Sequence, residues 1–396
     1  MGTVRQQSKR DVAQRMRERY LRAKGKADKT RLLDEFVELT GYDRVYARVL
    51  LRHGPPVRTG SIRRAGRPCA YGPQVVVALR VCAEVTGWIC GKRLVAILPE
   101  LVPALEKEGA LKLYGDERQA LLSMKSATID RRLREARRVA RPKGISTTKP
   151  GSLLKSQIPI RTYTPWDEQK PGFIEIDLVA HCGDSGAGEF LYTLNAVDVA
   201  TGWTECEPVA NKGQVAVFEA LQRIRQRLPF PLLGIDSDNG SEFINMHLLR
   251  YCQVESITFT RCRAYHKNDQ AHIEQKNYTQ VRQVVGYDRL RGEEALGQLR
   301  GIYRVLRLQT NGWLPAMKLV SKQRDGSKVK KQYDEPKTPL RRVLETTLAP
   351  TEARVEFERE LGECGPLKLK EALDAHREKL WRLRTRAQAP TSATAL

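Results

Sequence analysis

The sequence predicts a multidomain protein with an α/β core, helical domains before that core and a small β module after it. Three observations support this prediction. Helical, arginine-rich segments fill most of the first 143 residues, strand-like and helical runs alternate between residues 173 and 285, and an Asp-Gly turn separates two strand-like runs near residue 325. The length of 396 residues exceeds what a single compact core usually holds.

The composition predicts a folded protein that binds a polyanion. Hydrophobic residues make up 41% of the chain, which is typical of a folded protein. The formal net charge of +23 is far larger than solubility requires, so we expect double-stranded DNA as a partner. The chain has no run of about 18 apolar residues that could span a membrane, and its first 20 residues hold no signal-peptide core. We therefore expect no membrane contact and a cytoplasmic, nucleoid-associated location.

Residues 1–58 are expected to form a helix-turn-helix DNA-binding domain. Apolar residues follow a helical period between 28 and 39, Gly41 breaks the pattern, and a basic helix follows at 42–51. Three arginines of this second segment stand four residues apart and share one face: Arg44, Arg48 and Arg52. A helix, a glycine-containing turn and a basic helix are the outline of a helix-turn-helix. An ordinary helix pair with a solvated basic face is the alternative.

A second helical DNA-binding domain, also of helix-turn-helix type, is expected over residues 69–143. It follows a linker rich in Pro, Gly and Arg, and its helices begin at Pro73, a favoured first helical residue. Near its end a helix carries an apolar stripe on one face and a basic stripe on another, formed by Arg131, Arg134 and Arg138. This pattern fits a recognition helix, with a solvated helix face as the alternative. A Gly- and Pro-rich linker at 142–159 then leads to the core.

Residues 165–312 hold the predicted catalytic core. Three strand-like runs come first, and the short turns between them predict an antiparallel meander. Two further strand-like runs alternate with helical runs, which predicts parallel pairing. The strand-like runs are 173–182, 189–203, 203–210, 231–238 and 255–262, and the helical runs are 214–228, 241–253 and 271–285. This order is that of a ribonuclease-H-like domain.

Three carboxylates of this core are placed to meet at one point. Asp177 lies in the middle of an apolar strand, where an acid is costly unless it is paired or binds a cation. Asp238 ends the fourth strand and Glu274 lies in the first turn of the last helix, so both can reach that edge of the sheet. Carboxylate oxygens suit Mg²⁺ or Mn²⁺, and two such ions about 3.5–4 Å apart can carry out phosphoryl transfer.

Other residues compete for this site or surround it. Glu175 shares a strand face with Asp177, and Asp236 shares one with Asp238, so each is an alternative ligand. Contacts to DNA are expected for four polar residues near Glu274, with surface charges or a fixed loop as the alternative: Lys267, Asn268, Lys276 and Arg282.

Two motifs in the core point to a known family. The run IDSDNGSEF at 235–243, with 35 residues between Asp238 and Glu274, resembles the DD(35)E signature of retroviral integrases and bacterial insertion-sequence transposases. The run KNDQAHIEQKN at 267–277 is similar to the glutamate motif of one group of those transposases. The resemblance implies that Asp177 and Asp238 both contact a first Mg²⁺ and that Glu274 contacts a second.

The resemblance also implies a reaction and an assembly. DNA 3′ ends would be joined to target DNA by direct transesterification, within a homo-oligomer assembled on DNA. Two features depart from the family pattern. The zinc-binding N-terminal module of retroviral integrases has no counterpart, so the N-terminal helices must recognise DNA, and the loop before the glutamate reads YHKNDQ, without the glycine of the retroviral enzymes.

The C-terminal part predicts two small elements. Residues 313–345 hold the Asp325–Gly326 turn, which predicts a hairpin in a small basic β module on DNA. Residues 346–396 return to charged helix, with a break near Gly362 and a disordered last stretch. This helical tail either packs on another protomer or is solvated.

The sequence therefore predicts a DNA transposase that binds the terminal inverted repeats of its element and uses Mg²⁺ for 3′-end cleavage and strand transfer. A nuclease of the same fold without strand transfer is one alternative, and the two recognition helices argue against it. A non-enzymatic DNA-binding regulator is another, and the intact acid triad argues against it. The motifs indicate nothing for or against a helper ATPase.

Overall fold

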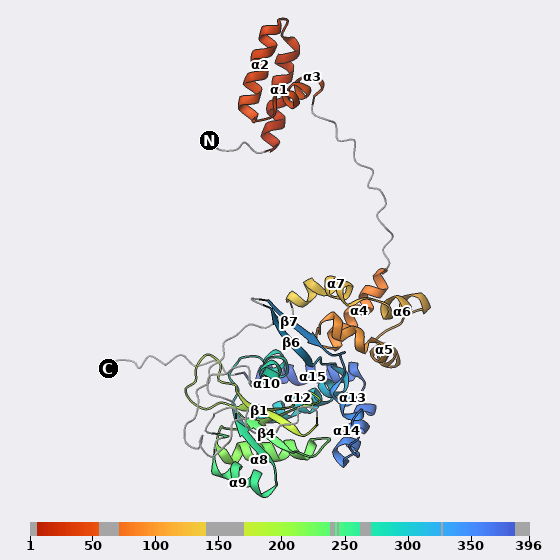
Figure 1. Ribbon diagram of the computed structural model, residues 1–396, viewed down its shortest axis with the longest axis vertical. Helices are drawn as coiled ribbons and strands as arrows, with labels where there is room; N and C mark the ends of the chain where they lie inside the picture. The colour runs from red at the N-terminus through yellow and green to blue at the C-terminus, as the bar shows by residue number, and fades with distance from the viewer. Residues whose placement is uncertain are drawn as a thin grey trace, which may run out of the picture. The chain divides into compact units, whose positions relative to one another are not determined.

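The computed structural model describes residues 6–54, 71–139, 170–237, 242–243, 245–261, 271–325 and 328–384. Their contacts gather the chain into two compact units, Met1–Cys69 and Ala70–Leu396 (Figure 1). The finer division into five domains stays a prediction. None of the helices within these ranges is both long and apolar enough to cross a lipid bilayer.

The first unit contains three helices around a small apolar core. Helix α2 ends at Gly41, whose φ of 67° favours glycine. Helix α3 begins after Asp43, whose side chain accepts hydrogen bonds from the N–H groups of Val45 and Tyr46. The helices are α1 (Gln6–Arg22), α2 (Lys26–Thr40) and α3 (Arg44–His53). The two helices expected between residues 28 and 51 are confirmed, and their role in DNA binding stays a prediction.

The second unit begins with four helices that pack around their own apolar cluster. Helices α5 and α7 approach closely at Gly91, where a Cβ atom would lie 2.3 Å from the carbonyl oxygen of Ser126. Arg137 of α7 donates to Asp130 at 2.5 Å and to the carbonyl oxygen of Trp88 at 3.1 Å, which ties α7 to the loop after α4. The helices are α4 (Pro73–Val85), α5 (Gly91–Lys107), α6 (Gly115–Leu122) and α7 (Ser126–Val139).

A five-stranded mixed sheet forms the centre of the second unit, in the order β3-β2-β1-β4-β5. Strand β1 pairs antiparallel with β2, which pairs antiparallel with β3. Strand β4 pairs parallel with both β1 and β5. The predicted meander followed by parallel strands is therefore confirmed. The strands are β1 (Phe173–Ala180), β2 (Tyr192–Asp198), β3 (Thr204–Val209), β4 (Gly234–Ser237) and β5 (Thr258–Arg261).

Helices cover both faces of this sheet (Figure 1). Ile174 and Ile176 of β1 pack in one cluster with α8 and α9, whereas Val179 packs in another with α12. Because side chains alternate along a strand, Glu175 and Asp177 lie on the α12 side of the sheet. These helices are α8 (Gln214–Arg227), α9 (Met246–Val254) and α12 (Gly292–Leu308).

Two helices differ from their predictions. The helix expected at 241–253 begins only at Met246, because Asn245 caps it by accepting a hydrogen bond from the N–H of Leu248 at 2.9 Å. The helix expected at 271–285 is interrupted by a π-helical segment, which widens its turns. It consists of α10 (Ala271–Lys276), the π-helical η3 (Asn277–Arg282) and α11 (Gln283–Val285).

A second π-helical segment, η4 (Gln309–Trp313), follows α12 and contacts the first. The hydroxyl of Thr310 in η4 donates to Oε1 of Gln280 in η3 at 2.6 Å, and both side chains are buried. A widened turn lacks the regular backbone hydrogen bonds of an α-helix and often marks a functional site. Here each widened turn supplies a polar partner for the other.

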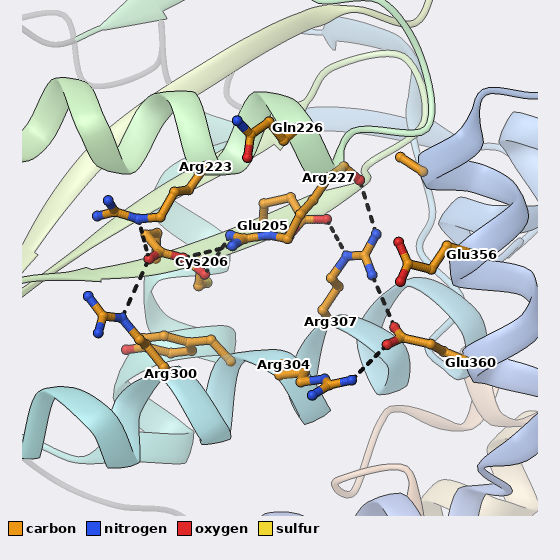
Figure 2. Close-up of a pocket in the computed structure, with 13 residues that line it drawn as sticks. Glu205, Cys206, Arg223, Gln226, Arg227, Arg300, Arg304, Arg307, Glu356 and Glu360 are labelled. Carbon is orange, nitrogen blue, oxygen red and sulfur yellow. Dashed lines mark hydrogen bonds and ion pairs between the residues drawn. The ribbon is translucent and has the colours of Figure 1, made fainter. Parts of the chain in front are cut away.

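Side chains close the edge of the sheet at β3. Asn311 accepts a hydrogen bond from the N–H of Thr204 and donates one to its carbonyl oxygen, both at 2.9 Å, as a neighbouring strand would do. Glu205 is 1% exposed and accepts hydrogen bonds from Arg227 at 3.1 Å and Arg307 at 2.8 Å (Figure 2). A hollow of about 440 Å³ beside this network is lined largely by arginines and glutamates. The strand order places this hollow at the β3 edge of the sheet, which is the edge opposite β5.

The C-terminal helices pack on the core of their own chain. Phe357 is completely buried, and its ring centroid lies 4.7 Å from that of Trp203. Leu373 and Leu380 are buried in the cluster that contains α12. The tail therefore packs on its own chain, which is neither of the two possibilities, another protomer or solvent, that the sequence analysis raised. The helices are α13 (Pro339–Leu344), α14 (Glu352–Glu363) and α15 (Pro366–Arg382).

A two-stranded hairpin joins η4 to α13. Its strands, β6 (Leu319–Asp325) and β7 (Lys328–Tyr333), pair antiparallel on either side of the predicted turn. The expected hairpin is thus confirmed, and its contact with DNA stays a prediction.

Replacement of Arg307 tests the network at the β3 edge. Its side chain is 10% exposed, and its loss leaves the buried carboxylate of Glu205 with fewer cationic partners. We expect Arg307→Leu to lower the free energy of unfolding by about 3 kcal/mol, measured by denaturant titration. Arg304→Leu is the matched control, because Arg304 is 78% exposed, and it should cost less than about 1 kcal/mol. Equal losses for the two variants would contradict this account.

Candidate active site

Strand β4 ends beside the middle of β1. In the parallel pairing of the two strands Ile176 lies opposite Ser237. Asp177 is the next residue of β1, and Asp238 is the next residue after β4. Asp238 itself lies outside the described residues. The pairing therefore brings the backbone before Asp238 next to Asp177, at the strand end where α/β sheets bind ligands.

Asp177 is a partly exposed carboxylate that is held by neutral donors. Its Oδ1 accepts a hydrogen bond from the N–H of Leu178 at 2.8 Å. Its Oδ2 accepts one from Nδ2 of Asn277, the first residue of η3, at 2.5 Å. Asn277 is fixed in turn, because its Oδ1 accepts from Nδ2 of Asn195 on β2 at 2.8 Å. The amide chain sets the orientation of the carboxylate.

Helix α10, which carries Glu274, is attached to β1 on both sides of that residue. The N–H of Ile273 donates to Oε2 of Glu175 at 3.1 Å, and Asn277 bonds to Asp177 one turn later. Nothing is described for the side chain of Glu274, but its backbone lies between these two attachments. The structure therefore brings the helical position of Glu274 close to the strand position of Asp177.

The two alternative acids are buried more deeply than Asp177. Glu175 is completely buried, and its carboxylate holds the N–H of Ile273 at the start of α10. Asp236 is also completely buried, and its Oδ1 accepts a hydrogen bond from the hydroxyl of Thr260 on β5 at 2.6 Å. These contacts give both acids a structural role within the sheet and favour Asp177 as the acid that reaches a ligand.

The donors at this edge fit a hard divalent cation. Among the described residues no group of three or more His, Cys, Asp or Glu side chains is assembled as a metal site. Of the three expected ligands, Asp238 and the side chain of Glu274 lie outside what the structure describes. Asp177 offers carboxylate oxygens on a partly exposed side chain that an amide and a backbone N–H orient. Such oxygen donors match the preference of Mg²⁺.

The expected DNA contacts near this edge are only partly described, because Lys267 and Asn268 lie outside the described residues. Lys276 is half-buried, and this burial, together with the charge of Arg93, lowers the pKa of its ammonium group to about 7. Burial also lowers the pKa of Arg282, whose guanidinium lies 5.0 Å from the ring centroid of Tyr287. Both side chains are thus engaged within the protein, and their contact with DNA stays a prediction.

The arginines expected on the recognition helices differ in their surroundings. Arg44 forms an ion pair with Asp34 of α2, and Arg138 forms one with Glu135 at 3.4 Å. The other four are exposed on α3 and α7: Arg48, Arg52, Arg131 and Arg134. Arg44 and Arg138 are exposed as well, and the contact of all six with DNA stays a prediction.

The sequence analysis did not single out Asn195 or Asn277 as functional residues. A signal for Asn277 was present, because it stands three positions after Glu274 and residues at that spacing share a helix face. Asn195 had no comparable local signal. Its role depends on the register of β2, which places it opposite Asp177.

Comparison with known proteins agrees with this architecture. Residues 167–267 match the family described as integrase core domain. The chain belongs to the integrase core family. It is 43% identical over 329 residues to uncharacterized protein y4rM of Sinorhizobium fredii (strain NBRC 101917 / NGR234), an alignment that covers 82% of this chain and 92% of that protein. The mixed sheet is that of an integrase core with a ribonuclease-H-like fold, which indicates an enzyme of the polynucleotidyl transferase type.

Two solved structures share a distant likeness with this integrase core. The crystal structure of the BIV integrase catalytic core domain is 16% identical, with 44% of this chain and 94% of that chain covered and a TM-score of 0.28. The HTLV-2 integrase catalytic core domain in complex with magnesium is also 16% identical, with 27% and 65% covered and a TM-score of 0.23.

A buried chain of polar side chains lies behind the site. Nε2 of His181 is 2.8 Å from Oγ1 of Thr193, which is 2.5 Å from the hydroxyl of Tyr303. Burial, followed by the charge of Arg282, lowers the pKa of His181 from 6.5 to about 3. The imidazole is therefore neutral in the folded protein at neutral pH.

This neutral histidine predicts a pH dependence of stability. Between pH 6.5 and 3 the unfolded chain binds a proton at His181 that the folded chain excludes, so the stabilising contribution present above pH 6.5 is lost as the pH falls. We expect His181→Gln to flatten the fall in unfolding free energy below pH 6.5 by up to about 1.4 kcal/mol per pH unit. Denaturant titrations of both proteins at pH 7, 6 and 5 measure this difference. Parallel curves would show that the folded and unfolded chains bind protons equally at His181, which would contradict the lowered pKa.

Proposed function

We propose that this integrase core protein is a DNA transposase that binds the terminal inverted repeats of its element, cleaves at the 3′ ends and joins them to target DNA. The observation that supports this proposal best is the attachment of α10 to β1. The bonds from Ile273 to Glu175 and from Asn277 to Asp177 hold the backbone of Glu274 beside Asp177. This attachment supports the assignment of Asp177 and Glu274 to one site.

The proposed metal ligands are Asp177, Asp238 and Glu274, with Mg²⁺ as the metal and Mn²⁺ as a substitute. Two bound ions would supply activation of the attacking water or 3′-hydroxyl and stabilisation of the leaving oxygen. Asn277 and the N–H of Leu178 orient the carboxylate of Asp177 before any ligand arrives. The reaction requires no nucleophile from the protein, because the attacking oxygen belongs to water or DNA.

DNA recognition is assigned to the two helical parts before the core. The first unit exposes Arg48 and Arg52 on α3, and the second exposes Arg131 and Arg134 on α7. Two separate DNA-binding parts would allow recognition of a long, asymmetric DNA end. The net charge of +23 also favours a DNA partner. Because two DNA ends must be joined, the active assembly would contain at least two protomers.

The first test is strand transfer with purified protein, Mg²⁺ and labelled duplexes of the element's own ends. We expect joined products from the wild type and none from Glu274→Gln, while binding of the ends persists. Glu294→Gln is the matched control, because Glu294 is an exposed acid in the first turn of α12. It should join DNA as the wild type does.

The other outcomes separate the alternatives. Cleavage without joining would indicate a nuclease of the same fold. Binding of the ends with neither reaction, in Mg²⁺ and Mn²⁺ alike, would indicate a DNA-binding regulator.

A second test concerns Asn277, which we propose as a positioning residue. Without its amide the carboxylate of Asp177 loses a hydrogen bond of 2.5 Å. Such supporting partners of metal ligands typically contribute 10- to 100-fold in metal affinity or activity. We expect Asn277→Ala to raise the Mg²⁺ concentration for half-maximal cleavage by about that factor, while Gln275→Ala, an exposed neighbour on α10, leaves it unchanged. Equal Mg²⁺ dependence of both variants would sink this role.

A further inference from the structure

The described residues of the hairpin β6–β7 lie outside the apolar clusters of their unit. Its apolar side chains are instead open to solvent: Val320 is 64% exposed and Tyr333 is 47% exposed. A two-stranded hairpin without a core is at best marginally stable in water. Its persistence in the fold therefore needs an anchor or a partner.

The anchor lies at the base of the hairpin. Arg342 of α13 donates to Oδ2 of Asp334 at 2.7 Å and to the carbonyl oxygen of Ala316 at 2.9 Å. Asp334 in turn accepts a hydrogen bond from the N–H of Lys318 at 2.6 Å. These bonds fix the direction of the two strands where they leave the core. They do not cover the faces of the strands beyond that point.

The charges of the hairpin indicate the chemistry of its partner. Between residues 318 and 331 there is a single acid, Asp325, and there are six basic residues: Lys318, Lys322, Arg324, Lys328, Lys330 and Lys331. The pairing register places Lys322 directly opposite Lys331. Like-charged residues at directly opposed positions lower the stability of a hairpin. An anionic partner would remove this cost.

The register also separates the two faces of the ribbon. Ser321 pairs with Gln332, Gln323 with Lys330 and Asp325 with Lys328, so one face carries three neutral hydrogen-bonding residues beside three charged ones. The pair of Lys322 with Lys331 belongs to the other face. A face that combines amides with lysines, together with a basic face behind it, fits contacts to base edges and to the phosphates around them.

We propose that the β6–β7 hairpin lies in the major groove of duplex DNA. The groove of B-form DNA admits a two-stranded ribbon, and Gln323 and Gln332 are residue types that pair with adenine there. The lysines contact the phosphates on either side. This inference rests on the proposed function, in which DNA is the substrate. It adds a DNA contact beyond those proposed for α3 and α7.

The lysines have one competing explanation. Both strands of a two-stranded sheet are edges, and lysines on an edge prevent pairing with other chains. If that were their only role, removing them would raise self-association and leave DNA binding unchanged.

The test uses the full-length protein without metal, so that catalysis plays no part. Binding of a DNA duplex is followed by fluorescence anisotropy over a range of salt concentrations for wild type and for the double variant Lys330→Gln/Lys331→Gln. The matched control is Lys368→Gln/Lys379→Gln, which removes two exposed lysines from α15. An RNA duplex of the same sequence is the second ligand, because its narrow major groove excludes side chains.

We expect the hairpin variant to bind DNA about tenfold more weakly at moderate salt, with the slope of log K against log salt reduced by about 1 to 2. The control should match the wild type, and the variant should lose nothing on the RNA duplex. Unchanged DNA binding, or an equal loss on DNA and RNA, overturns the groove contact. A wild type that binds no DNA at all overturns the proposed function instead.

Discussion

The hydrogen bond between Asn277 and Asp177 is the contact on which the candidate site depends. It joins a strand residue to a helix residue a hundred positions later, and no local element could bring the two together. The bond also decides how the carboxylate points, because its other oxygen is already held by the N–H of Leu178. A neutral amide suits this task, since a cation in its place would compete with a metal ion for the same charge.

The widened turn that begins at Asn277 depends on the packing around it. Gln280 in η3 receives a hydrogen bond from Thr310 in η4, and the neighbouring Gln309 donates to the carbonyl oxygen of Val85 at the end of α4 at 2.7 Å. The helix of the candidate site is therefore connected through two side chains to the helical block of α4–α7. The position of this block and the shape of the widened turns therefore depend on each other.

Local pattern was enough for much of the fold. Apolar strand-like runs and the turns between them predicted the strands and the directions in which they pair, because short turns favour antiparallel pairing and helical connections favour parallel pairing. The same pattern missed the π-helical turn in residues 271–285, whose Gln280 is bonded to Thr310, thirty residues later. It also missed Asn195, whose partner is set by strand register, and the docking of Phe357 on Trp203, which joins segments far apart in the chain.

The carboxylates of the core divide into two groups by the charge of their partners. At the β3 edge Glu205 and Glu207 are buried among arginines, and Arg227 donates to both. Those acids are neutralised and serve the packing of the C-terminal helices, so the hollow beside them is a poor site for a cation. Asp177 is on another strand, is partly exposed and accepts hydrogen bonds from an amide and a backbone N–H. The acids of the β3 edge thus lie among arginines, whereas Asp177 is partly exposed and offers the carboxylate oxygens that Mg²⁺ prefers.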